Sequence, residues 1–144
     1  IDEGNREGLA IEVGVSIPAS RVVRVLDQLI ALYGRPDAIR IDNGPELTSQ
    51  TLTDWAASRG ITLIYIQPGK PVQNAFIERF NRTYREEVLN AYLFHSTAEA
   101  QALSDAWLVD YNEHRPHDAL GRVPPLTYQP RVVPVPESRN PWLT

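Results

Sequence analysis

Two carboxylates, Asp42 and Glu78, stand in the part of the sequence best suited to chemistry, and 35 residues lie between them. Asp42 follows the alternating run 38–41 and precedes the turn-forming residues 43–45, so it is expected where a strand ends in an exposed loop. Glu78 falls in a helical pattern further along the chain. Oxygen ligands suit a hard divalent ion such as Mg²⁺, so the pair indicates a metal site if folding brings both side chains to one point.

The segment between the two carboxylates predicts a strand, a helix and a second strand. Apolar residues recur at helical spacing between residues 48 and 59, Gly60 supplies a C-terminal stop, and 61–66 is rich in β-forming residues. A right-handed crossover of this kind lays the two strands parallel, with the helix on one face. Active sites of such sheets lie at the carboxyl ends of the strands, where Asp42 is expected.

The helix that carries Glu78 is predicted to run from Val72 to about Asn90. At roughly 100° per residue, its apolar side contains Phe76, Ile77, Phe80, Tyr84 and Val88, and its polar side contains Asn74, Glu78, Asn81, Arg82 and Arg85. If the apolar side packs on the sheet, the polar side faces the loop of Asp42. We therefore expect the two carboxylates to lie within roughly 8 Å of each other.

Each carboxylate also has an ordinary explanation. Glu78 precedes Arg82 by four residues, which is typical of an exposed helical ion pair, and an Asp before Asn-Gly is a common turn former. The combination of three stretches favours function: IDNGPEL at 41–47, PGKPVQNAFIERFNRTYREEVLN at 68–90 and YNEHRPHDALG at 111–121. In this order and at these distances they resemble the integrase catalytic core of bacterial insertion-sequence transposases, the branch related to retroviral integrases.

The resemblance covers about residues 1–128 and implies a fold and an active site. The fold is α/β, a ribonuclease-H-like mixed sheet flanked by helices, here lacking its first strands. By matching position, Asp42 is similar to the second catalytic Asp of the family and Glu78 to the catalytic Glu. Asp2 does not match the first catalytic Asp, which is expected upstream of residue 1.

The function implied by the resemblance is metal-dependent cleavage and transfer of DNA strands at transposon ends. Two Mg²⁺ (or Mn²⁺) ions are expected in the intact site, with Asp42 and Glu78 as ligands, one to each ion. The residues expected to contact DNA are Lys70, Asn74, Arg82, Arg85 and Arg115. Because the family uses three carboxylates, this polynucleotidyl transferase fragment is expected to be inactive by itself.

Two other functions stay open at this stage. A metal-dependent nuclease of the same fold would share the carboxylates and lack strand transfer. A non-catalytic, truncated remnant would only bind DNA or its own copies. The chain does not begin with Met, which favours a fragment.

The overall charge is unusual for a DNA-binding protein, because the net charge is −4. The positive residues are unevenly spread, however, and Lys70, Arg79, Arg82 and Arg85 crowd around Glu78. Cysteine is absent, and the sequence has neither a signal peptide nor an apolar run long enough for a membrane span, which favours a cytoplasmic protein. Sequence-specific DNA binding is expected to belong to another part of the parent protein.

Other elements are predicted from local patterns. Residues 9–15 alternate like a half-buried strand, and a helix begins near Pro18, with Ser16 as its cap, and ends at Gly34. That helix has the apolar face Val22, Val25, Leu26, Leu29 and Leu32. Another helix begins at Ser96 or Thr97 with the buried stripe Ala102, Leu103, Ala106, Trp107 and Tyr111. Residues 129–144 are predicted to be a Pro-rich extended tail.

The stretch 114–117, His-Arg-Pro-His, does not favour a zinc site. Only His95 could join the two histidines, and Pro116 breaks the helical geometry that would align them. A structural corner with some DNA contact is preferred. Finally, in the ribonuclease-H-like order the absent strand lies between strand 9–15 and strand 38–41. The exposed edge of strand 38–41 is therefore expected to pair with another molecule or with residues 9–15.

Overall fold

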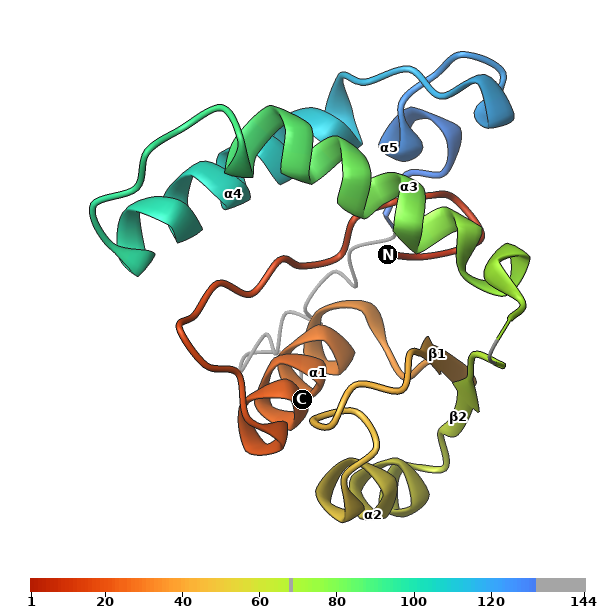
Figure 1. The fold of residues 1–144 in the computed structure, drawn as a ribbon. Helices are drawn as coiled ribbons and strands as arrows, with labels where there is room; N and C mark the ends of the chain where they lie inside the picture. Colours follow the sequence, from red (N-terminus) through yellow and green to blue (C-terminus); the bar gives the residue numbers. More distant parts are fainter. Residues whose placement is uncertain (68, 132–144) are drawn as a thin grey trace, which may run out of the picture.

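The structure is a computed structural model that describes residues 1–67 and 69–131 (Figure 1). Its elements are α1 (Ala19–Tyr33), β1 (Ala38–Ile41), α2 (Gln50–Arg59), β2 (Thr62–Tyr65), the 3₁₀-helix η1 (Pro71–Asn74), α3 (Ala75–Tyr84), the π-helix η2 (Arg85–Leu89), α4 (Thr97–Glu113), the 3₁₀-helix η3 (Asp118–Leu120) and α5 (Pro125–Tyr128). A small parallel sheet packs with helices in one layer, and further helices form a second layer, so the α/β class is confirmed. No helix among the described residues is long and apolar enough to cross a membrane.

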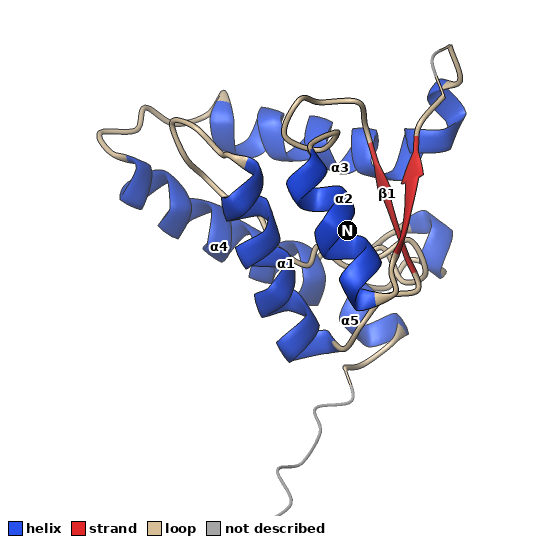
Figure 2. Ribbon diagram, turned by 90° about the horizontal axis from the view of Figure 1, so that it is seen from below, coloured by secondary structure: helices blue, strands red, loops and turns tan. Residues whose placement is uncertain are grey.

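The predicted strand, helix and strand around Asp42 form as expected. β1 and β2 are parallel, and Ile39 is paired in register with Leu63. Ser49 caps α2 by accepting a hydrogen bond from the Leu52 backbone at 3.3 Å, and Gly60 ends the helix in the left-handed region at φ 68°. Figure 2 shows the two strands side by side among the helices.

The main core joins this unit to α1. Its buried residues are Ile41, Leu52, Trp55, Ala56 and Ile61, and Val22, Val23, Leu26 and Ile30 of α1 pack against them. Trp55 also donates a hydrogen bond from Nε1 to Asp27 of α1 at 2.9 Å. The β1–α2–β2 unit and α1 therefore form one packed layer that fixes the position of the carboxyl ends of both strands.

A second layer consists of α3, η2 and α4. Phe80, which is 4% exposed, meets Trp107 and Tyr111 of α4 edge-on, with ring centroids 5.5 and 5.1 Å away. Tyr84 shares a hydrogen bond with Ser104 at 2.7 Å. Residues 1–15, red in Figure 1, run between this layer and α1. The N-terminal segment is thus the connection between the two layers.

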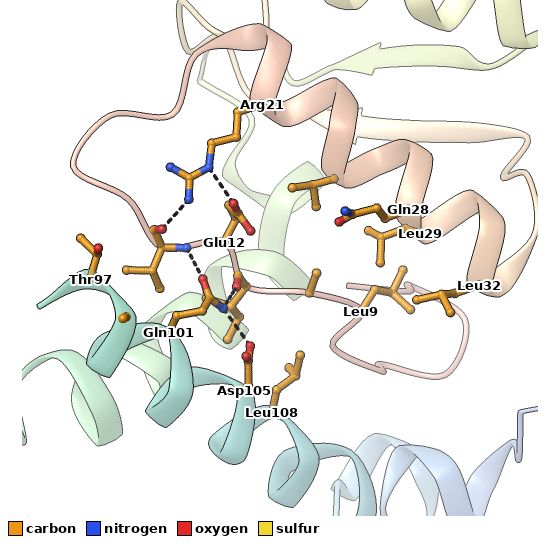
Figure 3. A pocket seen from close by; sticks show the side chains of 15 residues that line it. Leu9, Glu12, Arg21, Gln28, Leu29, Leu32, Thr97, Gln101, Asp105 and Leu108 are labelled. Atoms are coloured by element: carbon orange, nitrogen blue, oxygen red, sulfur yellow. Dashed lines mark hydrogen bonds and ion pairs between the residues drawn. The ribbon is translucent and has the colours of Figure 1, made fainter.

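The expected strand at residues 9–15 is wrong. The segment is extended but belongs to no ladder, because no neighbouring strand lies within reach in the described chain. Gln101 of α4 takes the place of a strand partner: its Oε1 accepts from Val13 N at 2.9 Å, and its Nε2 donates to Ile11 O at 2.8 Å (Figure 3). Alternation in the sequence signals a half-buried segment, whereas a strand also needs a hydrogen-bonding neighbour.

The helix that follows begins and ends as predicted, except at its cap. Pro18 is the N-cap of α1 and no side chain caps the helix, so the prediction for Ser16 is wrong. The helix ends at Gly34, whose N–H donates to Ile30 O at 2.8 Å. No residue of α1 is fully buried, and Leu32 is 65% exposed. The predicted apolar face of this helix is present, but part of it borders open cavities.

Two helical faces differ from their predictions. The helix at 72–90 is divided into η1, α3 and η2, and in it Phe76 is 43% exposed and Asn74 is half-buried. On α4, Ala102 and Ala106 are exposed, and the buried positions include the polar residues Ser104 and Asn112. These are buried because each has a specific partner: Ser104 bonds Tyr84, and Asn112 bonds the backbone of residue 8.

The C-terminal part of the core domain ends at α5. Arg131 lies beyond it and forms an ion pair with the buried Glu7. Residues 132–144, most of the predicted tail, lie outside the described residues.

Candidate active site

Asp42 stands at the end of β1. Ile41 anchors the strand because it is 8% exposed, and the next side chain, Asp42, is exposed. Asp42 Oδ1 accepts a hydrogen bond from Gly44 N at 2.8 Å, so the carboxylate shapes its own turn. Asn43 Nδ2 donates to Ile66 O at 3.1 Å and ties this turn to the chain that leaves β2. The turn is therefore fixed at the carboxyl edge of both strands.

Glu78 lies in the first turn of α3. Its side chain is exposed, and no ion pair to it occurs in the described ranges. A carboxylate at this end of a helix is favoured by the partial positive charge of the free N–H groups. Glu78 thus remains available to an external cation or donor.

The sheet and α3 meet at one cavity of about 940 Å³. It is lined by β1 residues 38–40 and by Asn74 and Ile77, which flank the start of α3. Because β1 and β2 are parallel, the chain leaves the same edge at which Asp42 stands and enters α3 after a short connection. Residues of β1 and of the start of α3 thus line the same cavity, and the 8 Å separation of the two carboxylates stays a prediction.

The donor set suits a hard cation. Both carboxylates are exposed and supply only oxygen, and Asp42 uses one oxygen for its turn while the other has no partner among the described residues. No three His, Cys, Asp or Glu side chains of the described chain form a cluster that could hold a metal ion. Two carboxylates fit Mg²⁺ or Mn²⁺ only if substrate, water or a further carboxylate completes the coordination.

Free positive charge is concentrated around α3. Across residues 1–67 and 69–131, seven arginines have acidic partners: Arg21, Arg35, Arg40, Arg59, Arg115, Arg122 and Arg131. Those that have none in the same ranges are Arg6, Arg24, Lys70, Arg79, Arg82 and Arg85. All of these except Arg24 lie on α3, at its two ends or against it. A chain of net charge −4 therefore still presents a local cationic surface.

The predicted DNA-contacting residues divide into two groups. Lys70, Arg82 and Arg85 are exposed and unpaired in the described chain, as a phosphate contact requires. Asn74 is half-buried at the 940 Å³ cavity. Arg115 is also half-buried and forms an ion pair with Glu87, so its charge is already neutralised.

Glu87 connects three elements. It lies on η2, accepts a hydrogen bond from Trp107 Nε1 at 2.7 Å and also bonds Arg115. The hydrogen bond from Arg115 is the main reason that the pKa of Glu87 is lowered, and the Trp107 bond adds to it. The predicted role of Trp107 in the core is thus only partly right, because the indole is half-buried and also orients a charged pair.

The histidine stretch forms the corner that was expected. His117 N donates to Val123 O at 3.1 Å, and Arg122 N donates to His117 O at 2.9 Å. The His117 ring packs edge-on against Tyr111 at 4.8 Å, and its Nε2 is buried with no hydrogen-bond partner among residues 1–67 and 69–131. Burial and then the positive charges of Arg115, Arg79 and Arg6 lower the pKa of His117.

Sequence comparisons find proteins that are similar to this chain over nearly all of its described length. Two family profiles, both described as integrase core domain, match residues 1–71 and 59–125. An uncharacterised protein of insertion element IS407 of Burkholderia multivorans is 46% identical over 89% of this chain. One of insertion element IS476 of Xanthomonas euvesicatoria is 44% identical over the same share. The chain spans 46% and 37% of these relatives.

Structural comparisons agree on the fold. The catalytic core domain of BIV integrase matches 81% of this chain and 73% of its own, with a TM-score of 0.60 and 26% identity. The HTLV-2 integrase catalytic core domain in complex with magnesium matches 75% of this chain and 68% of its own, with a TM-score of 0.54 and 22% identity. These matches confirm the ribonuclease-H-like architecture that the sequence predicts.

Proposed function

Because the chain belongs to the integrase core domain family, we propose that it is part of the catalytic domain of an insertion-element transposase that cuts and joins DNA strands. The observation that carries this proposal is the arrangement at the carboxyl edge of β1: an exposed Asp42, the start of α3 with Glu78, and a cluster of unpaired cations around the same helix. We place the reaction in the cytoplasm. The sequence contains no cysteine, so the fold has no disulfide that a reducing compartment would break.

In this proposal Asp42 and Glu78 hold the metal. Mg²⁺ or Mn²⁺, when bound, activates the attacking oxygen and stabilises the leaving oxygen of an in-line phosphoryl transfer. The contribution of the chain is to carry the two carboxylates at a strand end and in the first turn of a helix. The family site uses a third carboxylate, so the two in this chain bind metal weakly.

Lys70, Arg82 and Arg85 contact DNA phosphates in this proposal. They are exposed and free of carboxylate partners in the described chain, so binding DNA breaks no ion pair. Gly69 has φ 77°, a conformation that other residues rarely adopt, and it lets the connection before η1 adjust over a substrate. Arg115 acts through Glu87 rather than on DNA, since its guanidinium already forms an ion pair.

Metal binding tests the carboxylate pair directly. We expect Mn²⁺ to broaden the amide NMR signals around Asp42 and Glu78 in the wild-type chain, and we expect Asp42→Asn or Glu78→Gln to remove the broadening. Glu86→Gln is the matched control, because Glu86 is an exposed carboxylate on η2, directly after α3. Unchanged broadening in the Asp42 and Glu78 variants would overturn the proposed metal site.

A nicking assay separates this function from its two alternatives. The chain alone, with Mg²⁺ or Mn²⁺ and a supercoiled plasmid, is expected to release no nicked product. Nicking that Glu78→Gln abolishes would refute the need for a third carboxylate. In the full-length parent protein, cleavage without joined products would favour a nuclease, and binding without cleavage would favour a remnant that only binds DNA.

A further inference from the structure

Two of the unpaired arginines, Arg6 and Arg79, lie outside the Glu78 stripe. Arg79 follows Glu78 on α3 and therefore points roughly 100° away from it around the helix axis. It lies on the same side as Phe76, which precedes it by three residues. The guanidinium of Arg6 covers the Phe76 ring at 3.6 Å from the ring centroid. The N-terminal Arg6 thus stacks on a partly exposed ring of α3, and Arg79 follows that ring by three positions on the same helix.

The turn that carries Arg6 is built to hold it. Arg6 has φ 64°, which is unusual for a residue with a side chain, and its N–H donates to Asp2 O at 2.9 Å. Its two neighbours are buried polar residues: Asn5 is 5% exposed and Glu7 is 4% exposed. Glu7 is paired with Arg131 and also receives a hydrogen bond from Asn5. The turn therefore buries its flanking polar groups and directs the Arg6 side chain onto α3.

The next residue fixes the turn to the second layer. Gly8 N donates to Asn112 Oδ1 at 2.8 Å, and Asn112 Nδ2 donates to Gly8 O at 2.8 Å. A Cβ at Gly8 would lie 2.3 Å from Leu108 Cδ1 and 2.9 Å from Phe80 Cε2, so only glycine allows this close approach. Arg6 is consequently held two residues from a rigid anchor on α4.

The charges act together on a third element. Arg79 and Arg6, with the paired Arg115, lower the pKa of His117 after the larger effect of burial, and the same three arginines act on Tyr111. Positive charge from the N-terminal turn, from α3 and from the segment after α4 is therefore gathered within electrostatic reach of one corner. Arg6 and Arg79 have no acidic partner in the described chain, and unneutralised positive charge attracts anions.

We propose that Arg6 and Arg79 form a second contact for nucleic-acid phosphates, on the side of α3 turned away from the Glu78 stripe. The Arg6 guanidinium is preorganised by stacking and a strained turn, and the Arg79 side chain is exposed on the helix. A DNA backbone bound along Lys70, Arg82 and Arg85 continues around α3 onto this pair. The choice of DNA as the anion rests on the proposed function, and the position of the contact rests on the geometry alone.

Stacking of Arg6 on Phe76 would by itself be an ordinary structural contact. Two features indicate more than a structural contact. Arg79 shares the site without taking part in the stacking, and neither arginine has an acidic partner among the described residues, although the chain carries more acidic than basic residues. The seven paired arginines show that this fold usually supplies such a partner.

Salt-dependent DNA binding tests the proposal. Fluorescence anisotropy is measured with a labelled duplex of fixed sequence, in EDTA and without divalent metal, between 50 and 200 mM KCl. Arg6→Gln and Arg79→Gln are each expected to reduce the slope of log K against log salt by about 0.9 and to weaken binding roughly tenfold at 0.1 M salt. Arg6→Lys, which keeps the charge and loses the planar stacking, is expected to retain the slope. Arg24→Gln is the matched control, because Arg24 is exposed and unpaired in the described chain and lies on α1.

The outcomes separate this contact from the catalytic proposal. Unchanged slopes in both variants, with weaker binding by Arg82→Gln, would overturn the second contact and leave the transposase proposal standing. Loss of Mn²⁺ broadening at Asp42 and Glu78 has no bearing on the contact, since the binding assay contains no metal. Thermal melting of each variant excludes unfolding as the cause of weaker binding. If inorganic phosphate shifts the His117 NMR signals and DNA does not displace it, the site binds a free anion and the proposal fails.

Discussion

At the scale of single residues, Glu87 shows how a charged side chain is used for packing rather than chemistry. It accepts hydrogen bonds from the Trp107 indole on α4 and from the Arg115 guanidinium, just beyond the C-terminal end of that helix. The pair stabilises the turn at which α3 passes into η2, and Arg85, a predicted DNA contact, begins that turn. Glu87 therefore positions Arg85 without facing DNA itself.

Replacing Glu87 tests this role through its pH dependence. The pKa of Glu87 is lowered from 4.5 in the folded chain, so its stabilising effect is full above that value and is lost as the pH falls through the folded pKa. We expect Glu87→Gln to reduce the free energy of unfolding by about 1 kcal/mol at neutral pH, a modest value because the side chain is partly exposed. Urea unfolding should show this difference at pH 7 and its disappearance in strong acid. The exposed neighbour substitution Glu86→Gln should show neither effect.

His117 makes a prediction of the same direction at a higher pH. Its pKa is lowered from 6.5 by burial and by Arg115, Arg79 and Arg6, and Tyr111 packs on its ring, so folding favours the neutral imidazole. The unfolded chain binds the proton more readily, and stability therefore falls as the pH drops below 6.5. His117→Phe keeps the aromatic contact, and we expect it to flatten the melting temperature between pH 7.5 and 5.5. The exposed His114→Gln variant should retain the wild-type slope, and a flat wild-type profile would contradict this account.

Residue roles were predictable where they depend on local sequence. The turn at Asp42 and the helical position of Glu78 both follow from neighbouring residues, and the structure has them on a strand end and a helix start. The partners of arginines were not predictable, because they come from far along the chain. Arg115 meets Glu87 across 28 positions, and Arg6 reaches Phe76 from the other end of the fold.

At the scale of elements, the segment 9–15 is held by one side chain of α1 and one of α4. Arg21 of α1 donates to Val13 O at 2.8 Å and to Glu12 Oε1 at 2.6 Å. Gln101 bonds the backbone of Ile11 and Val13, as a neighbouring strand would, and a third hydrogen bond at 2.8 Å to Asp105 fixes its amide (Figure 3). The cavity of about 570 Å³ beside it is lined by α1 and α4, so little else covers the segment. The hydrogen bonds of Gln101 are therefore expected to limit the mobility of segment 9–15.

Hydrogen exchange tests this role of Gln101. Gln101→Ala should raise the exchange rate of the Val13 amide, because this N–H loses its acceptor, and should leave the interior of α4 unchanged. Gln28→Ala is the matched control: Gln28 is an exposed amide on α1 that lines the same cavity and bonds no residue of the segment. Equal protection of Val13 in wild type and Gln101→Ala would show that Arg21 and packing are enough to hold the segment.

Helices were predicted better than strands for a physical reason. A helix satisfies its own hydrogen bonds, so Ser49, Gly60 and Gly34 mark its limits wherever it packs. A strand forms only beside a partner, and 9–15 has none within the described chain. The division of the 72–90 helix into η1, α3 and η2 was not visible in the periodicity of the sequence. The polar buried positions of α4 were missed because their burial requires partners from elsewhere in the fold.

At the scale of the whole molecule, the main feature is the separation between the N-terminal segment and the sheet. The cavity of about 940 Å³ is lined on one side by Leu9 and Ala10, on another by β1, and on a third by apolar residues of α1. Hydrogen bonds from Thr62 N to Asp37 O and from Ile66 N to Ile41 O show that odd-numbered residues of β1 face β2. Ala38 and Arg40 therefore direct their backbone N–H and C=O groups toward the cavity.

An open β1 edge beside an apolar cavity is expected to bind another strand, here one from a second copy of the chain. Light scattering after size exclusion should then show a mass that rises with protein concentration. Ala38→Pro removes one edge N–H at the first position of the strand, where proline is tolerated, and leaves the bonds to β2 intact, so it should shift the sample toward monomer. Ala38→Val keeps that N–H and should associate like wild type. A wild-type chain that stays monomeric at every concentration, with the slow-exchanging amides of β1 limited to those that face β2, would show that this edge stays solvated and that the fold needs no strand there.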